Sequence, residues 1–258
     1  MMQYSNIFDT HAHYADSAFD ADRELLLNEK LPASGIQYVM LAGVTLPDCL
    51  QSQQLSQQYD YIYCSAGIHP EYVQNLPSNW LDQLRNLAKF PKCKAIGEIG
   101  LDYYQDKSNK PLQQNILIQQ IQLAKELNLP CIFHFREATG DAVQILKTFK
   151  PKGIFHCFTC SAEIAQELLS IPDLYFSFSG VVTYPNAKKP LKALEILPLE
   201  RILIETDSPY LSPVPFRGKR CDSSMILYTA QKIAEIKQLP LQDFIAICCE
   251  NARRIFRI

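Results

Sequence analysis

The sequence predicts a single (β/α)₈ barrel, an α/β fold of the TIM type, for residues 1–258. Eight short runs of apolar, β-favouring residues alternate with stretches of helical periodicity along the 258 residues. Eight such units in about 250 residues match this barrel in number and length. A doubly wound open sheet is the alternative, but it usually has fewer strands, and no glycine-rich phosphate loop follows the first run. We therefore expect a barrel whose active site lies at the C-terminal ends of the strands.

The eight runs are expected to form parallel strands that are buried on both faces, because Ile, Val, Phe, Tyr and Cys dominate them. They lie at residues 6–9, 37–43, 61–67, 94–99, 130–135, 153–158, 174–180 and 201–206. A helix-like stretch follows each run, as a parallel sheet requires.

Helices are predicted between the strands from apolar residues that recur on one helical face. Leu117, Ile121, Ala124 and Leu127 follow this spacing, and so do apolar residues within 80–87 and 164–171. Two further helices are expected at 225–236 and 241–256. Three polar segments, 105–114, 185–190 and 212–224, are expected to be loops on the active-site face, since each follows a strand.

Composition and charge restrict the class of protein. Hydrophobic residues make up 47% of the chain and charged residues 20%, which excludes a disordered chain and supports a sizeable core. No apolar run approaches the ~20 residues of a membrane span, and the N-terminus lacks the apolar core of a signal peptide. The nine Cys are irregularly spaced and odd in number, which is typical of reduced thiols. We therefore expect a cytoplasmic protein without membrane contact.

All five histidines lie at or just beyond the C-terminal end of a predicted strand. They are His11, His13, His69, His134 and His156. Histidines scattered over a surface would also fall on helices, and none of these does. His11 and His13 are two positions apart in an extended segment, so their side chains point to the same side. The sequence therefore predicts a cluster of imidazoles at the barrel mouth.

Carboxylates follow the same pattern. Glu98 ends the fourth strand, and Glu205 and Asp207 end the eighth, which neighbours the first when the barrel closes. Asp9 shares the face of His11 in this interpretation. Carboxylates buried together repel one another unless cations compensate their charge. Imidazole and carboxylate without thiolate suit Mg²⁺, Mn²⁺ or Zn²⁺, and we expect two such ions, which Glu98 can bridge at about 3.5–4 Å.

Eight short motifs give the chain a family resemblance. They are DTHAH at 9–13, GIHP at 67–70, GEIGLDYY at 97–104, HFREA at 134–138, HCF at 156–158, SFSG at 177–180, ETDSPYL at 205–211 and NARR at 251–254. With these motifs the sequence resembles the TatD family of metal-dependent hydrolases over nearly its whole length. The resemblance implies a barrel with a two-metal centre and deoxyribonuclease activity.

Carried over residue by residue, the resemblance implies two sets of metal ligands. One ion would be held by His11, His13, Glu98 and Asp207, and the second by Glu98, His134 and His156. Glu205 matches an additional acidic residue that the family has near its metals. Glu205 and Asp207 are therefore the expected catalytic groups.

Two segments depart from the family pattern. Residues 159–161 read Thr-Cys-Ser where the family usually has Ser-Gly-Ser, and loss of the glycine removes a position that adopts positive φ easily. Residues 221–223 read Cys-Asp-Ser where Asn, an acidic residue and Pro are usual. We expect these departures to alter the substrate side of the pocket and to leave the metal site intact.

Six residues are expected on the substrate side of the metals. They are His69, Asp102 and Arg136 near the strand ends, and Arg217, Lys219 and Arg220 in a basic run after the eighth strand. The net charge of −2 gives no general attraction for nucleic acid, so local cations must hold any phosphate. Arginine suits this task because its planar fork donates two hydrogen bonds at once.

The expected function is deoxyribonuclease activity of the exonuclease type on single-stranded or frayed DNA ends, with a metal-activated water. A barrel mouth admits a strand end better than the interior of a duplex. The alternative within enzymes is hydrolysis of another ester or amide bond, such as an aminoacyl-tRNA ester. The alternative outside enzymes is a metal-bound interaction protein without catalysis, which the complete set of acidic residues disfavours. DNA is the expected partner, and we expect a monomer without a stable protein partner.

Overall fold

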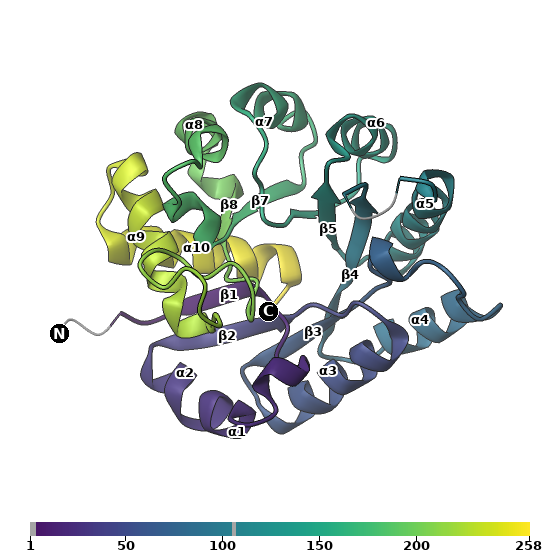
Figure 1. The fold of residues 1–258 in the computed structure, drawn as a ribbon, viewed down its shortest axis with the longest axis horizontal. Coiled ribbons are helices and arrows are strands. Elements are labelled where there is room, and N and C mark those ends of the chain that lie inside the picture. Colours follow the sequence, from purple (N-terminus) through teal and green to yellow (C-terminus); the bar gives the residue numbers. More distant parts are fainter. Residues whose placement is uncertain (1–3, 105–106) are drawn as a thin grey trace.

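The structure is a computed structural model that describes residues 4–104 and 107–258. Its eight parallel strands pair in chain order within one sheet. The strands are β1 (Ile7–Ala12), β2 (Ile36–Leu41), β3 (Ile62–Ala66), β4 (Cys93–Asp102), β5 (Cys131–Arg136), β6 (Gly153–Phe155), β7 (Leu174–Phe178) and β8 (Ile202–Ile204). Helices lie around these strands (Figure 1). The predicted (β/α)₈ barrel is confirmed.

Helices connect successive strands and form the outer layer. They are α1 (Arg23–Leu25), α2 (Leu31–Ala33), α3 (Leu46–Gln58), α4 (Trp80–Ala88), α5 (Lys110–Leu127), α6 (Thr139–Phe149), α7 (Ala162–Leu168), α8 (Lys188–Ile196), α9 (Ile226–Lys237) and α10 (Leu241–Phe256). The last helix has the predicted bounds, and α9 is shifted by one residue from its prediction. In the described part of the chain, no helix combines the length and the apolar character that crossing a membrane requires.

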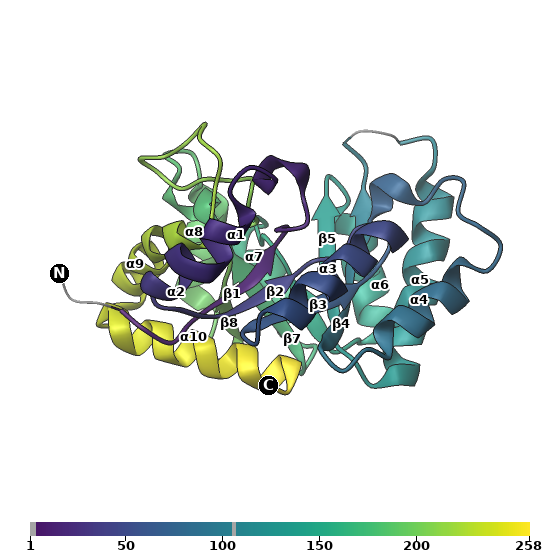
Figure 2. The ribbon, with the colours of Figure 1, turned by 90° about the horizontal axis from the view of Figure 1, so that it is seen from below.

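Apolar side chains close the barrel at the N-terminal ends of the strands. A buried cluster joins strand residues such as Phe8, Met40 and Leu203 to Cys249 and Phe256 of α10. This helix lies on the side of the molecule opposite to the long loops (Figure 2). A larger apolar cluster fills the space between the strands and the outer helices. Because α10 covers one end, the barrel presents its C-terminal end as the place for a site.

Two loop predictions were wrong at their C-terminal ends, where polar residues belong to the following helices. Residues 110–114 form the first turns of α5, and residues 188–190 begin α8. Pro111 and Pro190 stand in first helical turns, where the N–H that proline lacks has no helical partner anyway. Residues 105 and 106 lie outside the described residues. The third predicted loop, 212–224, is irregular until a short 3₁₀ turn at Ser223–Met225.

Candidate metal centre

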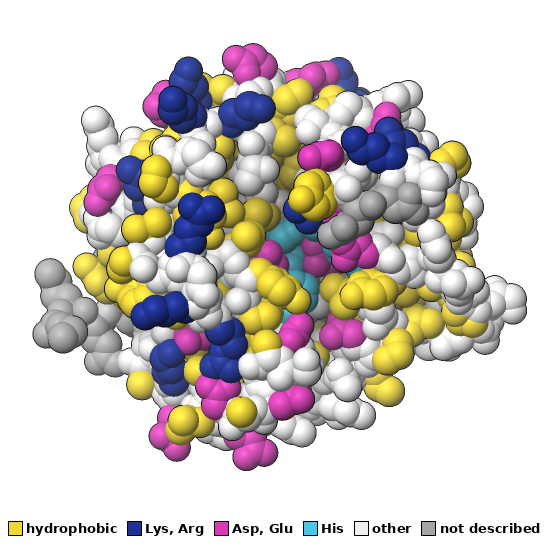
Figure 3. Space-filling view, in the orientation of Figure 1, with side chains coloured by type: hydrophobic (Ala, Val, Ile, Leu, Met, Phe, Trp, Pro, Cys, Tyr) yellow, Lys and Arg dark blue, Asp and Glu magenta, His cyan; other side chains and the backbone are white. Residues whose placement is uncertain are grey.

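The structure brings all five histidines together at the C-terminal ends of the strands. Figure 3 shows histidine side chains in a central hollow of this face. The cavity has a volume of about 380 Å³. Its lining includes four of the histidines and the carboxylates of Glu98, Asp102 and Asp207, together with Arg136. The predicted cluster of imidazoles and carboxylates therefore forms one pocket.

The seam between the first and last strands places His11 and His13 beside Asp207. The backbone N of Asp207 donates to the carbonyl O of His11 at 2.9 Å, and the N of His13 donates to Ser208 O at 2.7 Å. A parallel bridge between Ala12 and Ser208 continues this pairing. The seam thus draws the chain after β8 against the end of β1, so the motifs at 9–13 and 205–211 meet.

Asp9 does not join the histidines, contrary to the interpretation of strand alternation. The register of β1 against β2 shifts between Asp9 and Ala12, so the simple two-residue alternation fails there. The buried Asp9 carboxylate instead accepts hydrogen bonds from the N and Oγ1 of Thr206, at 3.0 and 2.6 Å, and from Ser223 Oγ at 2.6 Å. Asp9 therefore fastens the barrel seam beneath the site.

A glycine in β4 sets the position of His134. The register pairs Gly100 with His134 and Asp102 with Arg136. A Cβ on Gly100 would lie 1.7 Å from the carbonyl O of His134, so any larger residue would push β5 away. This close approach brings the His134 ring between the carboxylates of Asp102 and Glu98.

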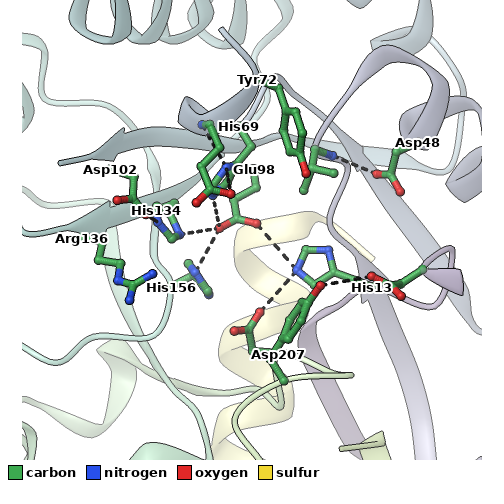
Figure 4. A pocket seen from close by; sticks show the side chains of 14 residues that line it. His13, Asp48, His69, Tyr72, Glu98, Asp102, His134, Arg136, His156 and Asp207 are labelled. Carbon is green, nitrogen blue, oxygen red and sulfur yellow. Dashed lines mark hydrogen bonds and ion pairs between the residues drawn. The ribbon is translucent and has the colours of Figure 1, made fainter. Parts of the chain in front are cut away.

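The two oxygens of Glu98 face two separate groups of imidazoles (Figure 4). Glu98 Oε2 lies 3.3 Å from His11 Nε2 and 3.7 Å from His13 Nε2. Glu98 Oε1 lies 2.8 Å from His134 Nδ1 and 3.1 Å from His156 Nε2. One buried carboxylate therefore stands between two sets of ligand atoms, which is the arrangement of a bridging ligand.

Asp207 completes one of the two groups. Its Oδ1 lies 3.3 Å from His13 Nε2 and 3.6 Å from His11 Nε2, and these two nitrogens are 3.2 Å apart. We call His11, His13 and Asp207 the Oε2 side of Glu98. His134 and His156 are its Oε1 side.

The outer nitrogens of three histidines contact groups that only accept hydrogen bonds. The pairs are His13 Nδ1 with Ala42 O, His134 Nε2 with Asp102 Oδ2, and His156 Nδ1 with Glu205 Oε1, each at 3.1 Å. The outer nitrogen of each neutral ring must therefore carry the proton. The inner nitrogen, which faces Glu98, then offers a lone pair. Such outer contacts are typical of histidines that bind metals.

His69 has the reverse arrangement. Its Nδ1 accepts a hydrogen bond from the backbone N of Glu71 at 3.2 Å, so a neutral ring carries its proton on Nε2. Burial lowers the pKa of His69 to about 3, which keeps the ring neutral. Its Nε2 lies 3.6 Å from Glu98 Oε1. Although His69 is close to Glu98 and His134, this geometry makes it a hydrogen-bond donor rather than a ligand.

The pKa shifts show how the carboxylates acquire positive partners. Burial lowers the pKa of His13, but its hydrogen bond to Asp207 and the charge of Glu98 outweigh burial and raise it to about 9. Burial also lowers the pKa of His134 and His156, and the adjacent carboxylates raise both overall. Burial raises the pKa of Glu98, but the surrounding imidazoles bring it well below its usual range. Without a metal, the imidazoles therefore hold the protons that balance the carboxylates.

The residues present fit divalent ions. Nitrogen and oxygen ligands that bind one ion at about 2.1 Å are about 3 to 3.4 Å apart. The inner nitrogens of His11 and His13 face each other at 3.2 Å and need a cation or a proton between them. The inner atoms of the Oε1 side lie at comparable distances from Glu98. Imidazole and carboxylate together suit Zn²⁺, Mn²⁺ or Mg²⁺.

Glu205 lies beneath the pocket rather than in its wall. It is fully buried, and its Oε1 accepts a hydrogen bond from the backbone N of Cys157 at 2.7 Å as well as facing His156. No hydrogen-bond partner of its Oε2 is found among the described residues. The structure thus places Glu205 where it orients His156.

The predicted substrate residues divide into two groups. Asp102 and Arg136 line the cavity, as does His69, and the Arg136 guanidinium lies 3.7 Å from the centre of the Tyr104 ring. The basic run after β8 does not line it. Arg220 pairs with Asp22 at 2.5 Å, and the Arg217 guanidinium lies 4.6 Å from the centre of the Tyr184 ring.

The rim contains residues that sequence reasoning missed. Asp16, Asp48 and Glu71 bring carboxylates to it, and Tyr72 and Tyr210 bring aromatic rings. Asp48 follows Thr45 by three residues at the start of α3, so its sequence signal is that of a helix cap. Tyr210 belongs to the motif at 205–211 and was open to inference from it.

Comparison with known sequences places the chain in a family. The sequence model of the family described as TatD related DNase matches residues 8–257. The chain is 42% identical over 255 residues to the metal-dependent hydrolase YabD of Bacillus subtilis (strain 168), which covers 98% of this chain and 99% of that protein. It is 35% identical over 222 residues to the 3′-5′ RNA nuclease TATDN2 of Homo sapiens, covering 83% of this chain and 29% of that protein.

Solved structures agree with the sequence relatives. The TatD homologue YJJV of Escherichia coli k12 matches with a TM-score of 0.91 at 26% identity, covering 98% of both chains. A TatD family hydrolase of Entamoeba histolytica shares the fold with a TM-score of 0.86 at 21% identity, covering 98% of this chain and 99% of that one. Matches over nearly the whole chain show that this protein belongs to the TatD-related DNase family of metal-dependent hydrolases.

Proposed function

We propose that this protein is a two-metal phosphodiesterase that removes nucleotides from the ends of single-stranded or frayed DNA. The observation that carries the proposal is the position of Glu98, whose two oxygens face two groups of inward lone pairs. A pair of ions bridged by one carboxylate suits hydrolysis of a phosphodiester, because both the attacking and the leaving oxygen gain positive charge.

The ligand sets follow from the inner atoms. One ion would be held by His11, His13, Glu98 and Asp207, and the other by Glu98, His134 and His156. When bound, such ions lower the pKa of a water molecule and neutralise the phosphate. Among the candidate metals, the four imidazoles favour Zn²⁺ or Mn²⁺ over Mg²⁺, which prefers oxygen ligands.

Residues around the metal ligands contribute substrate contacts. His69 directs a neutral Nε2–H toward the same space as Glu98 Oε1, where it donates to a substrate oxygen. Arg136, stacked on Tyr104, presents its guanidinium at the pocket wall and suits a phosphate. Asp102 and Glu205 hold the rings of His134 and His156 in place, which makes Glu205 a positioning residue in this proposal.

The shape of the site supports action on ends. The pocket at the metal ligands, of about 380 Å³, has room for about one nucleotide at the strand ends of the barrel. The relative TATDN2 is named as a 3′-5′ RNA nuclease, which supports nuclease activity in this chain and makes RNA the substrate to compare with DNA.

The test uses protein that has been stripped of metal with a chelator and then loaded with Zn²⁺, Mn²⁺ or Mg²⁺ in turn. Substrates are a linear single strand of DNA, the same strand closed into a circle, and the matching RNA. We expect cleavage of the linear DNA strand, none of the circle, and loss of activity in chelator. Equal cleavage of the circle would show an endonuclease, and preference for RNA would correct the sugar specificity.

A second candidate function rests on the acidic rim. Asp16, Asp48 and Glu71 bring negative charge to one rim of the mouth, which suits a substrate that carries an amino group near the scissile bond. An aminoacyl-tRNA ester has this chemistry. Release of amino acid from aminoacyl-tRNA, measured beside DNA hydrolysis with the same preparation, decides between the two. A protein that binds metals but turns over none of these substrates would be the non-catalytic alternative.

We propose that the protein acts as a monomer in the cytoplasm. The structure has nine free cysteines, most of them buried in the apolar core, such as Cys64 and Cys131. Buried free thiols are typical of a reducing compartment. Light scattering of the metal-loaded protein tests the oligomeric state.

A further inference from the structure

Two further hollows continue from the metal centre toward α8. The first of them, of about 440 Å³, shares Arg136, His156 and Asp207 with the central pocket. The next, of about 410 Å³, shares Thr159 and Val181 with its neighbour. The shared walls make one continuous depression across the ends of β5, β6 and β7. We call these two hollows together the α8 groove.

The character of the α8 groove changes along its length. Near the metal centre its walls are largely apolar, with Phe135, Val181 and Leu211. At the far end it reaches Lys188 and Lys189, both exposed at the start of α8. An apolar stretch beside cations suits a nucleotide strand, in which flat bases alternate with charged phosphates.

Arg217 adds a third cation to the far end. Its guanidinium lies 4.6 Å from the centre of the Tyr184 ring, and Tyr184 lines the last hollow. The Tyr184 hydroxyl donates to Ser212 O at 3.0 Å, which fixes the ring. Arg220 is not available in the same way, because it pairs with Asp22.

The opposite rim of the metal centre repels a nucleic acid. Asp16, Asp48 and Glu71 lie there, whereas the side toward α8 and α9 carries basic side chains (Figure 3). The phosphates of a strand held at the metals are therefore repelled by the acidic rim and attracted by the basic one. The charge difference selects one direction for the rest of the strand.

We infer that the α8 groove is the track of a single-stranded nucleic acid whose end is held at the metal centre. The apolar hollow takes a base, and Lys188, Lys189 and Arg217 contact the phosphates that follow. This inference rests on the proposed nuclease function and adds the path and the positioning residues of the substrate.

The test compares oligonucleotides of two to eight nucleotides on metal-loaded protein. The variant combines Lys188→Gln with Lys189→Gln, and the control combines Lys89→Gln with Lys125→Gln, which removes the same charge from exposed positions around α4 and α5. In the wild type we expect kcat/KM to rise with length. The variant loses most of this rise, so its kcat/KM for the longest strand falls several-fold. The slope of log binding constant against log salt concentration becomes shallower by about 0.7 for each lost phosphate contact. The control keeps the wild-type behaviour.

A second pair of variants tests the apolar part. Val181→Glu places a charge where the two hollows join, and Ile196→Glu places the same charge at an exposed position at the C-terminal end of α8, which lines neither hollow. We expect Val181→Glu to reduce kcat/KM for long strands relative to the dinucleotide and Ile196→Glu to leave this ratio unchanged. Folding of each variant is checked by circular dichroism.

The outcomes separate the two proposals. If the wild type cleaves long strands preferentially and both groove variants retain the wild-type length dependence, the track is elsewhere and the inference is wrong, while the nuclease proposal stands. If the wild type neither binds nor cleaves any oligonucleotide with any of the three metals, the proposed function fails and the inference fails with it.

Discussion

The Oε2 and Oε1 sides of Glu98 offer similar imidazoles but differ in where the negative charge lies. On the Oε2 side, Asp207 contacts the inner ring nitrogens directly, with Oδ1 3.3 Å from His13 Nε2. On the Oε1 side, Asp102 and Glu205 touch only the outer ring nitrogens. Direct carboxylates attract an ion more strongly than carboxylates that act through a ring.

Burial hardly distinguishes the two sides. Each has one buried ring, His11 or His156, and one partly exposed ring, with His13 at 10% and His134 at 19%. The Oε2 side thus has more direct charge, and the Oε1 side opens toward Arg136 and the α8 groove. For the proposed pair of ions, the comparison predicts an anchoring ion on the Oε2 side and a weaker, exchangeable ion that meets the substrate on the Oε1 side.

The change with the largest expected effect is Glu98→Gln, which breaks both sides at once. The amide keeps the size of the side chain but removes the charge that faces all five imidazoles. We expect at least one ion to be lost and kcat to fall by about 10³-fold, which corresponds to several kcal/mol. Metal content by mass spectrometry and turnover of the linear strand are the measurements. Wild-type turnover with two bound ions would contradict the role of Glu98 as a bridge.

Single histidine variants separate the two sides. His134→Ala should remove the ion of the Oε1 side and leave one tightly bound ion, while His13→Ala should weaken the anchoring ion. We expect activity to fall by roughly 10²-fold or more in each, since each ion contributes several kcal/mol. Metal titration followed by calorimetry shows which binding step is lost. Identical titration curves for the two variants would mean that the sides do not act as separate sites.

The sequence predicted the elements that place this centre. Strand-end positions alone grouped the histidines with Glu98 and Asp207, because the ends of parallel strands meet at one face of a barrel. The division of ligands between two ions came from the family resemblance. The structure now shows the matching geometry, in which each oxygen of Glu98 has its own imidazoles.

Other features depend on contacts that no spacing reveals. The strand alternation put Asp9 with the histidines, and a register shift in β1 moved it to the seam. The nitrogen that carries the proton in His69 and in His156 is set by a hydrogen bond. His69 Nδ1 accepts from the backbone N of Glu71, and His156 Nδ1 faces Glu205, which is distant in sequence. The sequence assigned the same phosphate-binding role to every residue of the basic run after β8. In the structure, Arg220 pairs with Asp22, whereas Arg217 stacks on Tyr184.

Glu205→Gln tests whether charge behind the ring matters. The amide can still accept a hydrogen bond from His156 Nδ1, but without its charge it no longer raises the basicity of the inner nitrogen, Nε2, which would bind the ion. We expect the affinity of the weaker ion to fall by about 10–100-fold, with the anchoring ion unchanged. The exposed Glu250→Gln in α10 is the control. A loss of rate with both ions bound at wild-type affinity would instead give Glu205 the catalytic role that the sequence predicted.

Proton release on metal binding distinguishes the sides further. The adjacent carboxylates raise the pKa of His13 to about 9 and also raise the pKa of His134 and His156, so these rings gain protons in the metal-free protein, whereas burial lowers the pKa of His11. Metal binding requires neutral rings, so affinity rises with pH. We expect more protons to be released on the Oε1 side, where two rings have a raised pKa, than on the Oε2 side, where only His13 does. Each released proton changes the affinity for the ion by about tenfold per pH unit. Calorimetry in buffers of different ionisation enthalpy counts them, and equal release from both sides would contradict the assignment.

The smallest expected effect comes from a change that touches neither side of Glu98. Arg220→Gln removes a partly exposed ion pair with Asp22, whose side chains are 33% and 35% exposed. Such pairs contribute about 0.2–1 kcal/mol, so the free energy of unfolding in urea should fall by no more than that. Because the Arg220 guanidinium is directed to Asp22 and Ala18 O, we expect strand affinity to change less than in Arg217→Gln, where the cation stacks on Tyr184 beside the α8 groove. Both variants should bind two ions as the wild type does. Equal losses of strand affinity in the two variants would mean that the whole basic run contacts phosphate, as the sequence alone predicted, and that the Asp22 pair opens when the substrate binds.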